Sequence, residues 1–228
     1  KYLKILGAKK NKLLGNLKFS ENKIEKSNLI NNNLKKFCKS KKIWCASSTH
    51  NTEEKLCAIA HQKLKLKYNN LLTIIIPRHI HRVKKITNEI KDLKLNIHLH
   101  SSKNKIKNNT DIYLVDTYGE TKVFFKVCKT VFLGGSIIRH GGQNPLESIR
   151  FGCNVIHGPY VKNFQEIYNL LKLKNLSTKI NNKHQLINAI NKSFNNNSNS
   201  QKKIDILKNI GLKILNNTYE EIENYIKN

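Results

Sequence analysis

The sequence predicts an α/β domain, a parallel β-sheet with helices on both faces. Short apolar runs alternate with amphipathic helical stretches along most of the 228 residues, and this alternation is typical of strands joined by crossover helices. The runs 71–76 and 111–115 are nearly continuous in apolar residues, as expected of strands that are covered on both faces. Glycine-rich and polar segments follow the runs, at the edge where a Rossmann-like sheet binds its ligands.

Apolar runs that end in turn residues locate the strands. The strands are predicted at 43–46, 71–76, 96–100, 111–115, 131–133 and 154–157. Helical periodicity locates the helices between and after them. The helices are predicted at 52–68, 83–93, 120–128, 145–151, 164–173, 181–189 and 203–226. The segment 13–19, LLGNLKF, is expected to be a strand that leaves an earlier domain, and a polar linker follows it.

Composition restricts the classes of protein and of site. The net charge of +27 is typical of proteins that bind nucleic acid or anionic membranes. However, lysine is spread over almost every segment, as in an AT-rich coding sequence, and aromatic residues are not interleaved with it, so no specific nucleic-acid binding is expected. Five widely spaced cysteines in apolar segments indicate buried thiols rather than disulfides or a zinc site. The apolar runs are too short for a transmembrane helix.

The segment 131–159 contains the most informative motif. An apolar strand leads into a glycine pair and a basic loop, and a second glycine pair precedes a helix start at Asn144. Glycines let the backbone approach a ligand closely, and the first N–H groups of a helix lack internal partners. The motif therefore predicts a phosphate site. Ordinary capping is the alternative, with Asn144 as N-cap, Pro145 at the first helical position and Glu147 in a capping box.

Polar residues also follow other predicted strands, at 47–50, 77–79 and 116–120. Carboxyl ends of parallel strands meet at one edge of a sheet, so these segments are candidates for one site. Arginine occurs only at Arg78, Arg82, Arg139 and Arg150. Since lysine is abundant, each remaining arginine indicates a position where a bidentate fork is needed. Arg78 and Arg139 follow strands, whereas Arg82 and Arg150 are expected to be surface or helix residues.

Four segments occur in order along the chain: WCASSTHNTEE, IIIPRH, VDTYGE and FLGGSIIRHGGQNPLE. Together they resemble the C-terminal half of the bacterial 3-deoxy-D-manno-octulosonic acid (Kdo) transferases of lipopolysaccharide synthesis, from about residue 15 to 167. The resemblance implies the Rossmann-like C-terminal domain of a GT-B type glycosyltransferase. It implies CMP-Kdo as donor, a lipid A precursor as acceptor, the anionic cytoplasmic face of the inner membrane as location, and no metal or cofactor.

The resemblance also implies a CMP site. Its residues are Pro77, Arg78, Tyr118, Gly119, Glu120, Asn144, Pro145, Leu146 and Glu147. In this assignment Arg78 and the helix N-terminus at Asn144 neutralise the phosphate of the leaving group. Glu147 accepts hydrogen bonds from the ribose, and residues 118–120 contact the base. Stabilising the departing CMP is the share of catalysis expected of this domain.

The same resemblance predicts three regions along the chain. Residues 1–40 form the end of an N-terminal domain and a linker, residues 41–200 form the CMP-sugar-binding domain, and residues 201–228 form a helix that packs back toward the N-terminal domain. The chain has no methionine, even at position 1, so we expect it to be part of a longer protein.

The chain departs from the family pattern in two respects. The family usually has methionine where Tyr118 stands. Its catalytic base is a glutamate of the N-terminal domain, which this chain lacks together with the membrane anchor, so no catalytic residue is assigned and sugar transfer by this chain alone is not expected. Two alternatives stay open. One is another glycosyltransferase or an epimerase that uses a UDP-sugar, and the other is a basic nucleic-acid-binding module.

Overall fold

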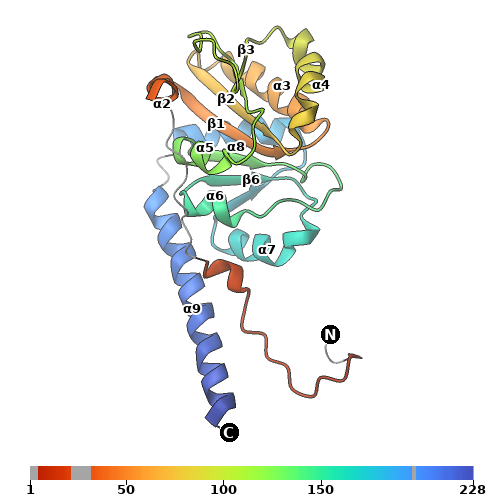
Figure 1. The fold of residues 1–228 in the computed structure, drawn as a ribbon, viewed down its shortest axis with the longest axis vertical. Helices are drawn as coiled ribbons and strands as arrows, with labels where there is room; N and C mark the ends of the chain where they lie inside the picture. The colour runs from red at the N-terminus through yellow and green to blue at the C-terminus, as the bar shows by residue number, and fades with distance from the viewer. Residues whose placement is uncertain (1–4, 22–31, 197–198, 228) are drawn as a thin grey trace. The chain divides into compact units, whose positions relative to one another are not determined.

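The computed structural model describes residues 5–21, 32–196 and 199–227. The chain divides into two units, Ile24–Ile204, and Lys1–Lys23 together with Asp205–Asn228. Within the described residues the first of these units contains one seven-stranded sheet in the order β3-β4-β2-β1-β5-β6-β7, and every strand pair is parallel (Figure 1). The strands are β1 (Lys42–Thr49), β2 (Leu71–Pro77), β3 (Ile97–Leu99), β4 (Ile112–Leu114), β5 (Thr130–Leu133), β6 (Asn154–His157) and β7 (Ser177–Lys179).

Helices connect the strands in the order that the sequence predicts. They are α2 (Asn32–Lys39), α3 (Glu53–Lys65), α4 (Val83–Ile90), α5 (Thr121–Val127), α6 (Leu146–Arg150), α7 (Gln165–Leu173), α8 (Lys183–Asn195) and α9 (Ser200–Lys227). Short 3₁₀ turns are η1 (Leu17–Phe19), η2 (Ile80–Arg82), η3 (Lys91–Leu93) and η4 (Lys162–Phe164). The predicted α/β fold is therefore confirmed, with α2 and β7 as elements that the sequence analysis missed.

The prediction of a strand at 13–19 is wrong. Residues Leu17–Phe19 form a 3₁₀ turn instead, and the Asn16 side chain caps it by accepting a hydrogen bond from the Lys18 N–H at 3.0 Å. Asn is a strong N-cap residue because its oxygen satisfies a free backbone donor. The linker predicted after this segment falls largely on residues 22–31, which lie outside the described residues.

Both faces of the sheet are covered by helices. On one face the fully buried strand residues Trp44 and Ile75 share an apolar cluster with Ile86 of α4 and Ile190 of α8. On the opposite face the ring of Tyr113 in β4 packs against Phe124 of α5, with ring centroids 5.9 Å apart. All seven residues of β2 are buried, which explains its continuous apolar sequence.

The second unit contains η1 and the portion of α9 from Asp205 onward. Gly211 lies against the backbone of Phe19, where a Cβ would approach the Phe19 carbonyl oxygen to 2.5 Å. Lys12 and Glu221 form an ion pair at 2.6 Å. The predicted helix 203–226 is confirmed as part of α9. None of the described helices combines the length and the apolar character needed to cross a membrane.

The strand order identifies the edge where a ligand is expected. β1 lies between β2 and β5, so the chain builds one half of the sheet on one side of β1 and the other half on the opposite side. In open parallel sheets ligands bind beyond the carboxyl ends of the strands at such a reversal. The segments that follow β1, β2, β4 and β5 all emerge at this carboxyl edge.

Candidate ligand-binding site

The glycine loop after β5 holds an anion that the protein itself supplies. The backbone N–H groups of Gly135, Ser136 and Ile137 donate to the Glu53 carboxylate at 2.7, 3.1 and 3.1 Å. The N–H of His50 donates to the same carboxylate at 3.0 Å. The predicted phosphate site is therefore wrong for these loop amides, because the buried Glu53 side chain already accepts their hydrogen bonds.

Glu53 links the turn after β1 to the loop after β5. It is the first residue of α3 and is fully buried. Burial raises the pKa of its carboxyl, and the four backbone donors act in the opposite direction. Gly134 permits the close approach of the two segments, since a Cβ there would lie 2.4 Å from the Ser48 carbonyl oxygen and 2.8 Å from Glu53 Oε2. The Glu53 carboxylate thus holds the loop after β5 in place through hydrogen bonds to its backbone.

The second half of the loop forms the predicted helix start. Asn144 Oδ1 accepts a hydrogen bond from the Leu146 N–H at 3.1 Å, but the N-cap position of the helix is Pro145, so the predicted N-cap at Asn144 is wrong. The helix begins at Leu146, one residue after the predicted start at Pro145, and has five residues. Because a macrodipole grows with the number of aligned peptide units, this short helix contributes little to anion binding.

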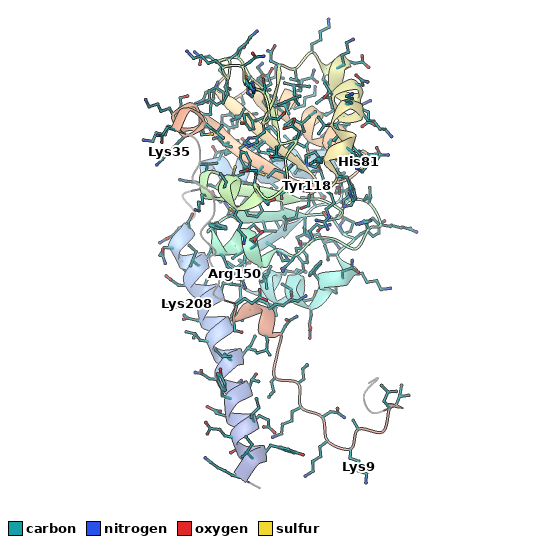
Figure 2. All side chains as sticks on the ribbon, viewed as in Figure 1. Lys9, Lys35, His81, Tyr118, Arg150 and Lys208 are labelled. Atoms are coloured by element: carbon teal, nitrogen blue, oxygen red, sulfur yellow. The ribbon has the colours of Figure 1, made fainter. Side chains whose placement is uncertain are left out.

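Glu147 does not close a capping box. Within the described residues its carboxylate makes no bond to the Asn144 N–H, and it lies instead 3.6 Å from Lys122 Nζ of α5. This pair brings the starts of α5 and α6 together, and with them residues 118–120 and 144–147. Tyr118, labelled in Figure 2, is 68% exposed, and Gly119 has a φ of +85° that favours glycine.

Basic side chains gather at the ends of β1 and β2. Pro77 is the buried last residue of β2, and the N–H of the exposed Arg78 donates to the Thr49 carbonyl at 2.9 Å. The His50 ring centroid lies 4.0 Å from that of His140 and 5.8 Å from that of His79. Burial lowers the pKa of His50 to about 4, and the neighbouring histidines and arginines add to this effect. The cluster of Arg78, His50, His79 and His140 is called the basic cluster below.

Arg82 differs from the predicted surface role. Its guanidinium is only 13% exposed and forms two hydrogen bonds with the fully buried Glu54, at 2.8 and 3.2 Å. A bidentate pair of this kind fixes the start of α4 against α3. In contrast, no ion pair or hydrogen bond of the Arg78 side chain is present within the described part of the chain. Arg150 ends α6, as expected of a helix residue.

Several buried polar atoms at the carboxyl edge lack partners. Within the described residues, His50 Nε2, Ser47 Oγ, Thr49 Oγ1 and Thr117 Oγ1 make no hydrogen bond. Buried polar groups in proteins are nearly always bonded, to protein or to another molecule. Their position at the end of β1 and after β4, next to the basic cluster, marks the place where a polar ligand is expected.

Sequence reasoning missed Glu53, and it included His50 in the candidate segment 47–50 without giving it a role. Both lie in the segment 47–54, whose polar residues are compatible with an ordinary helix start. A hollow of about 410 Å³ lies elsewhere, between α3, α4 and the start of α8. It is lined by Asn51, Thr52, Lys55, Leu56, Ile59, Glu89 and Lys183, and contains none of the predicted site residues. Among the described residues no group of three or more His, Cys, Asp and Glu side chains is arranged to hold a metal ion.

Known proteins similar to this chain were found by sequence and by structure. No protein-family model matches the chain. The 3-deoxy-D-manno-octulosonic acid transferase of Haemophilus influenzae is 38% identical over 130 residues, which are 57% of this chain and 30% of that protein. The transferase of the same name from Rickettsia prowazekii is 29% identical over 209 residues, 92% of this chain and 45% of that protein. The chain is a Kdo transferase homologue.

The comparison with solved structures supports the fold that was predicted for this Kdo transferase homologue. The C-terminal CMP-Kdo binding domain of WaaA from Acinetobacter baumannii superimposes with a TM-score of 0.69 and 23% identity, covering 80% of this chain and 93% of that chain. The fold is that of the C-terminal domain of a GT-B glycosyltransferase, as predicted. The chain spans less than half the length of the two curated relatives, 30% and 45%.

The segments that carry the resemblance meet in space. WCASSTHNTEE covers β1 and the start of α3, and IIIPRH ends β2. VDTYGE follows β4, and FLGGSIIRHGGQNPLE joins β5 to α6. Distant parts of the sequence of this Kdo transferase homologue thus contribute to one edge of one sheet.

Proposed function

We propose that this chain is the donor-binding domain of a glycosyltransferase that moves Kdo from CMP-Kdo to a lipid A precursor. The observation that carries the proposal is the convergence of the four family segments on the carboxyl edge, where buried polar atoms and the Arg78 guanidinium have no partners among the described residues. Two curated relatives of the chain are named as 3-deoxy-D-manno-octulosonic acid transferases.

The proposed CMP site uses the three segments predicted from the sequence. Arg78 binds the phosphate, since an arginine with no protein partner can give two donors to one anion. Exposed Tyr118 stacks on the cytosine, and Glu120 and the loop at Gly119 border it. Asn144, Pro145 and Leu146 shape the opposite wall, and Glu147 accepts bonds from the ribose hydroxyls.

In this proposal the chain stabilises the leaving group and does not act as the base. Neutralising the charge that develops on the departing CMP phosphate lowers the barrier to transfer. The base, the acceptor site and the membrane anchor belong to other parts of the whole enzyme. We place that enzyme at the cytoplasmic face of the inner membrane, where a net charge of +27 attracts anionic lipid headgroups.

The domain arrangement follows from the same proposal. Residues 41–200 bind the donor, residues 1–40 are the end of a preceding domain and its linker, and the helix at 201–228 packs back toward that domain. Apolar side chains on α9 support this arrangement, because they are exposed to solvent: Tyr219 at 58%, Ile222 at 50%, Tyr225 at 85% and Ile226 at 76%. Exposed apolar residues in a row are typical of surfaces that a partner covers.

Calorimetric titration with CMP, UMP and UDP tests the proposed donor. We expect CMP to bind most tightly, because the site has contacts for one phosphate and for the cytosine edge. An Arg78→Ala, Glu147→Ala double variant is expected to lose CMP binding, whereas Lys84→Ala, at an exposed position of α4, keeps it. Tighter binding of UDP than of CMP would replace this proposal by a UDP-sugar enzyme. Unchanged CMP binding by the double variant would show that the site lies elsewhere.

A further inference from the structure

His50 is the least explained polar residue at the carboxyl edge. Its side chain is buried, with the residue 7% exposed, and Nε2 has no hydrogen-bond partner in the described part of the chain. A buried imidazole ordinarily uses both ring nitrogens, one as donor and one as acceptor. The ring instead lies beside two other histidines, His140 and His79.

The acidic residues near His50 cannot serve as its partner. The Glu53 carboxylate already accepts four backbone N–H groups. The Glu54 carboxylate is held by both terminal nitrogens of Arg82. The basic cluster therefore has donors, and on Arg78 a positive charge, that these two carboxylates do not match, and an anion from outside the chain is the group that would match them.

The His50 side chain of the basic cluster and the nearby Gln143 side chain converge on a position without a side chain. Gly135 has a φ of +64°, and a Cβ built there would lie 3.3 Å from His50 Nε2 and 3.4 Å from Gln143 Nε2. A bare backbone at this point lets a ligand approach both side chains. The exposed His140 ring contacts the His50 ring, with centroids 4.0 Å apart.

We propose that His50, His140 and Gln143 bind the carboxylate of the donor sugar, beside the phosphate contact of Arg78. This inference rests on the proposed function and extends it from CMP to the sugar acid. A nucleotide-linked ulosonic acid has a carboxylate and a phosphate on the same anomeric carbon, so its site needs two adjacent groups of donors. The bond from the Arg78 N–H to Thr49, next to His50, places these two groups side by side.

The test compares three ligands by calorimetry: CMP, CMP-Kdo, and a neutral analogue of CMP-Kdo in which a carboxamide replaces the carboxylate. The wild-type chain is expected to bind CMP-Kdo roughly tenfold more tightly than the carboxamide, the size of one charge-assisted hydrogen bond. In His50→Ala and in His140→Ala this preference falls to about twofold or less. The affinity for CMP itself stays unchanged in both variants.

His81→Ala is the matched control. His81 is an exposed histidine that contacts His79, with centroids 5.5 Å apart, and it lies outside the basic cluster. It is expected to keep the full preference for the carboxylate. His140 is exposed, so its substitution leaves folding intact even if His50→Ala alters the loop, and thermal unfolding followed by circular dichroism checks both.

The outcomes separate the two proposals. If the wild-type chain binds CMP but does not prefer the carboxylate over the carboxamide, the carboxylate site is wrong and the CMP site stands. The same conclusion follows if both histidine variants keep the full preference. If the wild-type chain binds no CMP, the proposed function fails and the carboxylate site fails with it.

Discussion

Two regions of the sheet, the start of β4 and the end of β1, differ in how completely their buried polar groups are paired. At the amino edge, Asp111 before β4 accepts hydrogen bonds from Lys65 and from the backbone and side chain of Asn96. The buried His61 ring bridges Asp111 and Thr73, with contacts of 3.3 and 2.8 Å. At the carboxyl edge, by contrast, the buried side-chain oxygens of Ser47 and Thr49 in β1 and of Thr117 after β4 have no partner in the part of the chain that the structure describes.

We assign the paired polar groups to the stability of the fold and the unpaired polar groups to ligand binding. A completed buried network stabilises one arrangement of the chain, and it leaves no atom for a ligand. An incomplete network costs stability, since each unpaired buried polar group loses its bonds to water. The carboxyl edge therefore retains unpaired groups that only a ligand can satisfy, as expected where a site is prepared in advance.

The pKa values of Asp111 at the amino edge and His50 at the carboxyl edge are shifted by different causes. Burial alone would raise the pKa of Asp111, but the hydrogen bonds from His61, Lys65 and Asn96 outweigh burial and hold it below its ordinary range. For His50, burial and the neighbouring cations act in the same direction and lower the pKa to about 4. The charge of Asp111 is compensated within the protein, whereas the Arg78 guanidinium near His50 has no ion-pair partner among the described residues.

Removing Asp111, the shared acceptor of the amino-edge hydrogen bonds, should have the largest effect on stability. Asp111→Ala leaves His61, Lys65 and Asn96 without their acceptor, so we expect a loss of about 4 kcal/mol in the free energy of unfolding. Urea denaturation followed by circular dichroism measures this loss. Asp92→Ala, an exposed carboxylate in η3, is the control and should change stability by less than about 0.5 kcal/mol. CMP affinity of the folded Asp111→Ala chain should equal that of wild type, and a large decrease would contradict the division between the edges.

The second largest effect should appear as pH dependence at the carboxyl edge. His157 ends β6, its Nδ1 lies 2.7 Å from the Gly158 carbonyl, and burial lowers its pKa to about 4. Because the folded value lies below the unfolded value of 6.5, its contribution to stability is complete above pH 6.5 and is lost as the pH falls toward 4. The loss amounts to about 3 kcal/mol for one histidine.

Comparison with a variant isolates this contribution. The difference in unfolding free energy between pH 7 and pH 4 should be smaller in His157→Gln than in wild type, since all other groups titrate in both. His184→Gln, at an exposed position of α8, should leave the wild-type difference unchanged. An equal pH dependence of His157→Gln and wild type would mean that folding does not lower the pKa of His157.

Removing the unpaired arginine should affect binding and spare stability. Arg78→Ala eliminates the side chain that we assign to the phosphate, so CMP binding should weaken roughly tenfold. The free energy of unfolding should change by less than about 0.5 kcal/mol, because the exposed guanidinium makes no bond within the described residues. Calorimetry and urea denaturation measure the two quantities. A stability loss like that of Asp111→Ala would place Arg78 among the structural residues.

The sequence allowed prediction of the elements whose signal is local. β2 was located by its continuous apolar run, and the start of α6 was located to within one residue by the Asn-Pro pair before it. β7 was missed because Ser177–Lys179 is short and largely exposed and carries no apolar pattern. The partner of the glycine loop could not be predicted, since Glu53 lies 82 residues before Gly135 and only the strand order brings them together. Arg82 is a similar case, because its acceptor Glu54 is 28 residues away on another helix.

The smallest predicted effect concerns backbone strain, which also differs between the edges. Thr52, in the turn after β1, has a φ of +76° and makes no capping hydrogen bond with its side chain. A β-branched residue in this region is strained, so Thr52→Gly should raise the free energy of unfolding by about 1 kcal/mol. Lys94, which follows η3 at the amino edge, has a φ of +53° in an ordinary helix-end position. Lys94→Gly should therefore gain less than about 0.5 kcal/mol, because an unbranched residue tolerates this conformation better. Equal gains in urea denaturation would show that the strain at the carboxyl edge is not greater than at the amino edge.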